Sequence, residues 1–92
     1  MVEFDWDDAN TEHVARHDVT PSEAEQVLKN DPADGGVQDH DGEERRVEVG
    51  MTDALRFLVV ITTSRDDTIR VVTAYPASPA ARQFYTLEKG IK

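Results

Sequence analysis

Apolar and polar positions alternate at the start of the chain and then change to a helical period. Phe4 and Trp6 alternate with acidic residues, which predicts a short, half-buried strand over 4–6. A helix should follow, opened by Asp7 or Asp8 and packed through Val14. The chain is therefore expected to begin with a strand and a helix.

A second helix is predicted from a local start signal. Thr20-Pro21-Ser22-Glu23 combines a threonine N-cap, proline at the first helical position and glutamate at the third, which is a capping box. Val27 and Leu28 lie on one face, and Asn30-Asp31-Pro32 ends the helix. Residues 31–42 are rich in Gly and Asp, so we expect a loop there.

The second half of the chain has the pattern of a sheet followed by one helix. Three β-rich stretches follow one another, at residues 43–50, 55–63 and 68–75. The short turns between them predict two antiparallel hairpins. A last helix should run from about Pro79 to Lys89. The fold class expected is α+β: a mostly antiparallel sheet of about four strands, with two N-terminal helices and one C-terminal helix.

These elements place the core. With 92 residues, we expect residues 1–92 to form a single domain around one core. The residues predicted to be largely buried are Trp6, Val14, Val27, Leu28, Val47, Val49, Leu58, Val60 and Phe84.

Charge is distributed unevenly along the sequence. The net charge is −9, which by itself argues against nucleic acid binding. Residues 1–44 carry 14 acidic and 2 basic side chains, whereas residues 45–92 carry 5 acidic and 8 basic ones. The second half could therefore present an anion-binding face and the first half could meet a basic partner, unless both are simply solvated surface.

Several classes of protein are not expected from this sequence. There is no cysteine, so disulfides and thiolate zinc sites are impossible. The opening MVEFDWDD has neither a basic nor an apolar region, and no apolar run approaches the ~20 residues of a membrane span. We expect a soluble, cytoplasmic protein without membrane contact. No Gly-rich loop joins a strand to a helix, so no nucleotide cofactor is expected either.

The candidate metal ligands in the sequence are the three histidines, His13, His17 and His40, with the aspartates beside His40. His13 and His17 are four residues apart on a predicted helix, the spacing at which both could bind one ion. No HExxH string or clear third ligand accompanies them, so a hydrogen-bonding His17 at the helix end is favoured. Asp39-His40-Asp41 is more typical of a solvated turn than of a site. We expect no metal.

Arginines on or beside the strands are the remaining candidates for chemistry. Arg45 shares the parity of Val47 and Val49 and so points to the core side, where a charge must reach a rim or find a carboxylate. Arg65, Arg70 and Arg82 follow in the turn, strand and helix. Converging arginines could clamp a phosphate. On residue type alone, separate ion pairs with this acidic chain are favoured.

An ordered set of motifs resembles the BrnT family of toxins. FDWDDANTEHVARHDVTPSEA is similar to that family's Phe-x-Trp-Asp strand, short helix and second helix. GEERRVEVG resembles its Gly-Glu-Glu-Arg strand, LVVITTSRDDTIRVVTA its apolar strand, Arg-containing turn and following strand, and ASPAARQFY the start of its last helix. The resemblance covers nearly the whole chain, in order.

The resemblance implies a RelE-like fold and a metal-independent endoribonuclease that cleaves RNA. It also implies neutralisation by a cognate antitoxin that is basic and binds DNA, so that DNA is contacted only through the antitoxin. The positions that match the family's pattern are His17, Glu44, Arg45, Arg65, Arg70, Arg82 and Tyr85. The resemblance implies that Arg45 and Arg65 both bind substrate and act in catalysis. It implies substrate binding alone for Arg70 and catalysis alone for Arg82. His17 or Glu44 would transfer protons, with Tyr85 as a further candidate. We expect Arg45, Arg65 and Arg82 to converge near one rim of the sheet.

Some positions depart from the family's pattern. Tyr75 and Pro76 stand where the family has arginine and lysine, and Pro79-Ala80-Ala81 replaces a basic, Glu-containing helix start. Loss of these groups predicts weakened cleavage. The alternative is a catalytically silent module that retains only binding to an antitoxin or other partner. A small basic DNA-binding protein in the neighbouring reading frame would support a toxin–antitoxin pair, and an RNA cleavage assay would separate the two hypotheses.

Overall fold

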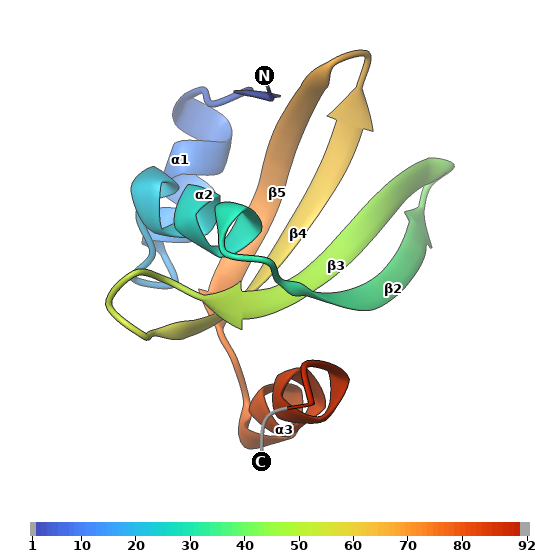
Figure 1. Ribbon diagram of the computed structural model, residues 1–92. Coiled ribbons are helices and arrows are strands. Elements are labelled where there is room, and N and C mark those ends of the chain that lie inside the picture. Colours follow the sequence, from blue (N-terminus) through green and yellow to red (C-terminus); the bar gives the residue numbers. More distant parts are fainter. Residues whose placement is uncertain (1, 91–92) are drawn as a thin grey trace.

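The computed structural model describes residues 2–90 and has an α+β fold. Its elements are β1 (Glu3–Phe4), α1 (Asp8–Ala15), α2 (Pro21–Lys29), β2 (Ala33–His40), β3 (Glu43–Met51), β4 (Phe57–Arg65), β5 (Thr68–Pro76) and α3 (Pro79–Glu88). The strands form one twisted sheet in the order β1-β5-β4-β3-β2 (Figure 1). Among the strands described, β1 and β5 form the one parallel pair and the other three pairs are antiparallel. The predicted fold class, α+β with a mostly antiparallel sheet, is confirmed.

Both N-terminal helices begin where local hydrogen bonds predict. The carboxylate of Asp7 accepts from the Asn10 backbone, and the Asn10 side chain accepts from the Asp7 backbone, which closes a capping box before α1. Thr20 and Glu23 form the expected capping box of α2. The first strand is shorter than predicted, because Trp6 lies outside it and instead donates a hydrogen bond to Glu25 on α2.

The prediction of a loop over residues 31–42 is wrong. Residues 33–40 form β2, an antiparallel edge strand paired with β3. Only Ala33 in it is buried, so the strand has no apolar face to give the alternation by which strands are recognised. Gly35 allows close packing, since a Cβ there would lie 3.0 Å from a Val47 methyl carbon. The hydrogen bonds to β3, rather than burial, make this segment a strand.

The three predicted strands of the second half are confirmed, with small shifts in their ends. The β4 strand begins at Phe57 rather than at residue 55, because Leu55 adopts a positive φ of 66° in the preceding turn. A β-bulge lies between β4 and β5: Ile61 pairs with Thr73 and Thr62 with Val71, so that Val72 is the extra residue. Because of this extra residue, the residues of β5 before Val72 face the opposite side of the sheet from the one that they would face in regular pairing.

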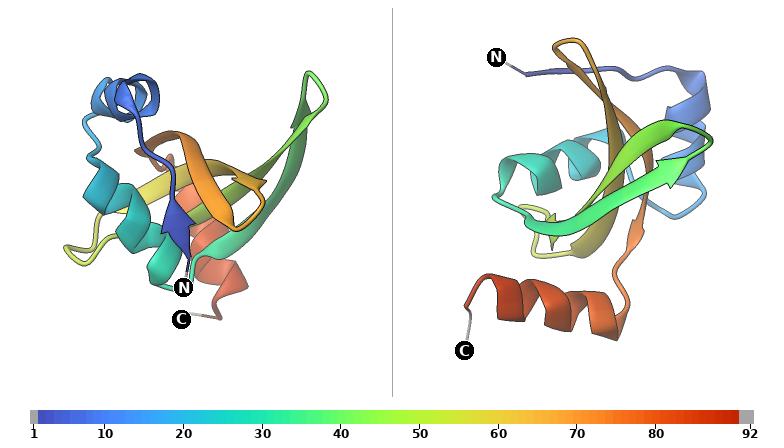
Figure 2. Two further views of the ribbon diagram at one scale, coloured as in Figure 1. Left: turned by 90° about the horizontal axis from the view of Figure 1, so that it is seen from above. Right: turned by 90° about the vertical axis from the view of Figure 1, so that its right-hand side faces the viewer.

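The sheet is covered by helices on both faces (Figures 1 and 2). One cluster joins α1 and α2 to the sheet, and its fully buried large side chains are Val14, Val27, Leu58, Val60 and Val71. A second cluster lies between the opposite face and α3, around Val49, Val59 and Tyr85. Of the predicted core, Trp6, Leu28, Val47 and Phe84 are only partly buried, because they lie at the margins of these clusters.

No helix within residues 2–90 is both long enough and apolar enough to span a membrane.

Candidate active site

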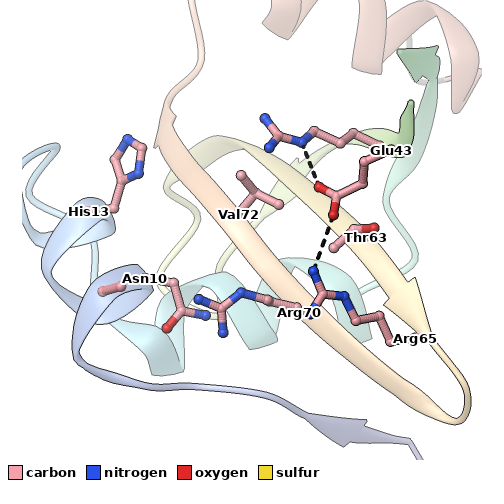
Figure 3. A pocket seen from close by; sticks show the side chains of 9 residues that line it. Asn10, His13, Glu43, Thr63, Arg65, Arg70 and Val72 are labelled. Carbon is pink, nitrogen blue, oxygen red and sulfur yellow. Dashed lines mark hydrogen bonds and ion pairs between the residues drawn. The ribbon is translucent and has the colours of Figure 1, made fainter. Parts of the chain in front are cut away.

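Three arginines from three adjacent strands line one hollow on the sheet. Arg45 of β3, Arg65 of β4 and Arg70 of β5 surround a cavity of about 300 Å³ (Figure 3). The strand residues that line the hollow face the same side of the sheet as the cluster under α3. Helix α3 itself lies at the other end of these strands (Figure 1). The pairing of the strands brings these residues together: Arg70 of β5 is paired with Thr63 of β4, and paired residues face the same side of a sheet. Thr63 also lines the hollow. The sheet thus places three cationic groups on one open surface.

A carboxylate stands between two of these arginines. Glu43 accepts hydrogen bonds from Arg45 Nε at 3.1 Å and from Arg65 Nη2 at 3.3 Å (Figure 3). The hydrogen bonds from Arg45 and Arg65 hold the pKa of Glu43 below its usual value. Glu43 therefore stays ionised and partly neutralises both guanidinium groups in the absence of a ligand.

Arg70 is paired with the N-terminal segment. Its guanidinium lies 3.3 Å from an Asp5 carboxylate oxygen and 3.0 Å from an Asp7 carboxylate oxygen. The hydrogen bond from Arg70, together with that from the Asn10 backbone, holds the pKa of Asp7 below its usual value. Each of the three arginines that line the hollow thus already forms an ion pair with a carboxylate of the same chain. Such ion pairs are the expectation from residue type alone.

The wall opposite the arginines is provided by α1. Asn10 is 3% exposed and donates hydrogen bonds to the carbonyl oxygens of Asp5 (2.8 Å) and Val71 (3.0 Å). These bonds attach α1 to the edge of β5 beyond the point where β1 ends. One turn later, His13 is carried to the rim of the hollow (Figure 3). A buried amide therefore fixes the distance between an imidazole and the arginine cluster.

Some residues predicted for the site lie elsewhere. Arg82 is not part of the hollow: its guanidinium lies 5.9 Å from the centre of the Phe57 ring, at the first residue of β4. Arg65 is the last residue of that nine-residue strand, and at ~3.3 Å per residue the two ends are roughly 26 Å apart. The predicted convergence is correct for Arg45 and Arg65 and wrong for Arg82. Tyr85 is 6% exposed and packs edge-on against the same Phe57 ring, so it is a core residue.

The two residues predicted to transfer protons lie beside the hollow rather than in its lining. Glu44 is exposed and, by the alternation of a strand, faces away from the side that carries Glu43 and Arg45. The neighbouring glutamate therefore lines the hollow. His17 is exposed one helical turn beyond His13, with the two ring centres 6.0 Å apart. Glu43 could have been found from the sequence, because it lies two positions before Arg45 and therefore faces the same side of the strand.

The candidate metal ligands do not form a cluster. Within residues 2–90, no group of three or more His, Asp or Glu side chains is arranged to hold a metal ion. His13 and His17 are stacked with an interplanar angle of 29°, and His40 lies at the end of β2 next to the exposed Asp41.

Comparison with known proteins identifies the chain at the family level. No curated protein sequence matches it. The model of a family described as the ribonuclease toxin BrnT of type II toxin–antitoxin systems matches residues 6–80. The matched segment includes all the strands from β2 to β5 and every residue that lines the hollow. The protein is therefore a member of the BrnT family of type II toxin–antitoxin ribonuclease toxins.

Proposed function

We propose that this protein is a metal-independent endoribonuclease and that the arginine-lined hollow is its active site. The observation that carries the proposal is that one hollow is lined by three arginines, a glutamate and a histidine: Arg45, Arg65, Arg70, Glu43 and His13. These are the three kinds of side chain that RNA cleavage without a metal requires: cations for the phosphate, a base and an acid.

The arginines supply binding and charge stabilisation. A guanidinium donates paired hydrogen bonds that match the geometry of phosphate oxygens, and it stays charged at any physiological pH. Arg65 has the most exposed side chain of the three, with a relative accessibility of 66%, whereas Arg45 and Arg70 are at 25% and 21%. Arg65 would therefore make first contact with the backbone, and the other two would hold the phosphate deeper in the hollow.

Glu43 and His13 are the proposed proton carriers, in place of Glu44 and His17. Glu43 takes the proton of the 2′-hydroxyl, whose oxygen attacks the adjacent phosphorus. The bond from phosphorus to the 5′-oxygen breaks, and the protonated imidazole of His13 gives this oxygen its proton. The products are a 2′,3′-cyclic phosphate and a 5′-hydroxyl end. A phosphate that binds both arginines weakens their bonds to Glu43, which raises the basicity of the carboxylate when it is needed.

Cleavage is expected to be slow. A phosphate must displace Glu43 from two arginines and compete with Asp5 and Asp7 for the third. The arginine that the family has at position 75 is also absent, and the loss of one charge-stabilising donor typically costs on the order of 10²–10³ in rate. We therefore expect slight or no growth inhibition when the protein is induced in a bacterial host.

Membership of a type II toxin–antitoxin family implies an antitoxin partner. We infer that its toxin-binding segment is basic and meets the acidic half of the chain, residues 1–44. A cationic segment would relieve the mutual repulsion of 14 acidic side chains there. DNA would be contacted only through the antitoxin.

A second candidate function is a catalytically silent binding module. The observation in its favour is that the three arginines of the hollow are all held by carboxylates of the same chain. Such a protein would still bind the antitoxin but would not cleave RNA at a measurable rate.

The test is RNA cleavage by the purified protein in EDTA, followed by analysis of the product ends. Glu43→Gln and Arg45→Ala should each lower the rate by about 10²-fold or more, while cyclic phosphate ends should be found on the wild-type products. Glu12→Gln and Arg46→Ala are matched controls, because both residues are exposed and form ion pairs away from the hollow. A wild-type rate in both hollow variants would refute the site, and no cleavage by any form would favour the silent module.

A gain-of-function variant tests the account of slow cleavage. Tyr75→Arg should raise the rate and the growth inhibition, because it restores a cation at the position where the family has one. Strong toxicity of the unmodified chain, unchanged in an Arg45→Ala, Arg65→Ala double variant, would contradict both the site and the predicted weakness.

A further inference from the structure

We propose that His17 and Tyr75 form a stacking surface for an unpaired RNA base next to the hollow, so that the substrate is single-stranded at the cleaved bond. This inference rests on the proposed function and deepens it. It assigns a specificity role to two residues that the proposed chemistry does not use.

The rings of three residues form a row that begins at the hollow. The His13 and His17 rings are 6.0 Å apart between centres, and the His17 and Tyr75 rings are 5.9 Å apart. His13 lines the hollow, so the row leads directly away from the proposed cleavage point. Two different elements build it, since the histidines are one turn apart on and just after α1 and Tyr75 comes from β5.

The row is exposed but its far end is held in place. Both histidines are exposed, and within residues 2–90 neither imidazole takes part in a hydrogen bond or ion pair. Tyr75 is partly buried and packs against the apolar cluster under α3. A ring fixed in this way loses little rotational freedom when a base stacks on it. The surface is thus both accessible and preorganised.

Stacking is the interaction by which proteins commonly bind unpaired bases. Bases of single-stranded RNA stack on aromatic rings, on histidine and on the plane of an arginine guanidinium. This stacking tolerates different bases, because every base has a π-face. An arginine replaced by Tyr75 would therefore lose its charge but keep a flat surface for the base. A base within a duplex has no free face, which makes the row selective for unpaired RNA.

A fluorescent, uncleavable oligonucleotide tests the surface without relying on catalysis. The probe is a 2′-O-methyl oligouridine of eight nucleotides with one internal 2-aminopurine, whose fluorescence falls when the base stacks. The 2′-O-methyl group blocks the attacking hydroxyl at every position. We expect quenching at saturation by the wild-type protein, and equal quenching by Tyr75→Phe, which keeps the ring.

Removal of a ring should remove both the quenching and part of the affinity. Tyr75→Ala and His17→Ala should each bind roughly 5- to 150-fold more weakly, the range expected when one stacked base is lost. Arg45→Ala should weaken binding while the quenching at saturation stays the same. A second oligonucleotide has the same sequence but an abasic site in place of 2-aminopurine. It should bind the wild-type protein as weakly as the intact probe binds the Tyr75→Ala variant. Thermal unfolding of each variant establishes that the fold is kept.

The outcomes separate this inference from the proposed function. Quenching that depends on Tyr75, in a protein that cleaves no RNA, would support the stacking surface and refute only the catalysis. RNA cleavage with unquenched probe, or with equal affinity for the intact and abasic probes, would overturn the stacking surface and leave the catalysis standing. Failure of the wild-type protein to bind the probe at all would overturn the inference.

Discussion

The buried amide of Asn10 offers a prediction in which stability and site geometry can be separated. Its side chain closes the capping box of α1 and donates to the carbonyl oxygens of Asp5 and Val71. Asn10→Ala keeps the Asp7 N-cap, whose carboxylate accepts from the backbone of residue 10, but removes the bond that the Asp7 backbone donates in return, at about 0.5–1.5 kcal/mol. It also leaves the buried Val71 carbonyl without this donor, at about 1–3 kcal/mol. Together we expect a loss of roughly 2–4 kcal/mol, a large share of the roughly 5–15 kcal/mol that small domains have.

Urea and thermal unfolding measure this loss, and a loss of that size should lower the Tm by roughly 10–30 °C in a chain of this length. Asn10→Asp keeps the acceptor for the Asp7 backbone but places a carboxylate oxygen against the Val71 carbonyl in a buried position, so it should cost at least as much as Asn10→Ala. The matched control is Asn30→Ala, whose amide donates two exposed hydrogen bonds, to Met51 and Asp53. If Asn10→Ala unfolded at the same urea concentration as the parent, the attachment of α1 to β5 described above would be incorrect.

Three further predictions concern the core, acid stability and the partner. Leu58→Ala should lower the free energy of unfolding by roughly 2–4 kcal/mol, because the side chain is fully buried. Leu87→Ala is the control and should change the urea midpoint little, because Leu87 is 72% exposed. If Leu58→Ala had the same urea midpoint as the parent protein, the assignment of β4 as the central strand would be wrong. Burial opposes ionisation of Glu23, but hydrogen bonds from the Thr20 backbone and Arg56 outweigh it and lower the pKa of Glu23. The contribution of ionised Glu23 to stability should therefore be complete at a pH above 4.5, the ordinary pKa of a glutamate, and should be lost as the pH falls through the lower pKa of the folded state. Glu23→Gln should accordingly make the free energy of unfolding fall less steeply with decreasing pH. Association with a cognate antitoxin should slow markedly between low and physiological salt if the acidic half steers it, and an on-rate independent of salt would exclude that account.

Features that depend on contacts between neighbouring residues could be predicted from the amino-acid order alone. The Thr20–Glu23 capping box, the proline at the start of α2 and the short turns of the two hairpins were all predictable, because each is fixed by contacts within a few positions. Arg45 could likewise be placed on the correct face, since alternation within one strand is local. Strand β2 was not predictable in the same way, because an exposed edge strand carries no buried face and is specified by its partner β3.

Which residues meet in the hollow depends on contacts between segments that are distant in the sequence. The bulge at Val72 is the clearest case: in regular pairing Thr63 would oppose Val71, whereas the extra residue makes it oppose Arg70 and turns that arginine toward the hollow. The position of His13 depends on the hydrogen bond between Asn10 and Val71, which are 61 residues apart. The position of Arg82 depends on α3 packing over the other end of the sheet. A one-residue change of register reverses the faces of a strand, and no local pattern encodes such a change, so the membership of the site follows from pairing between distant segments rather than from the order of residues.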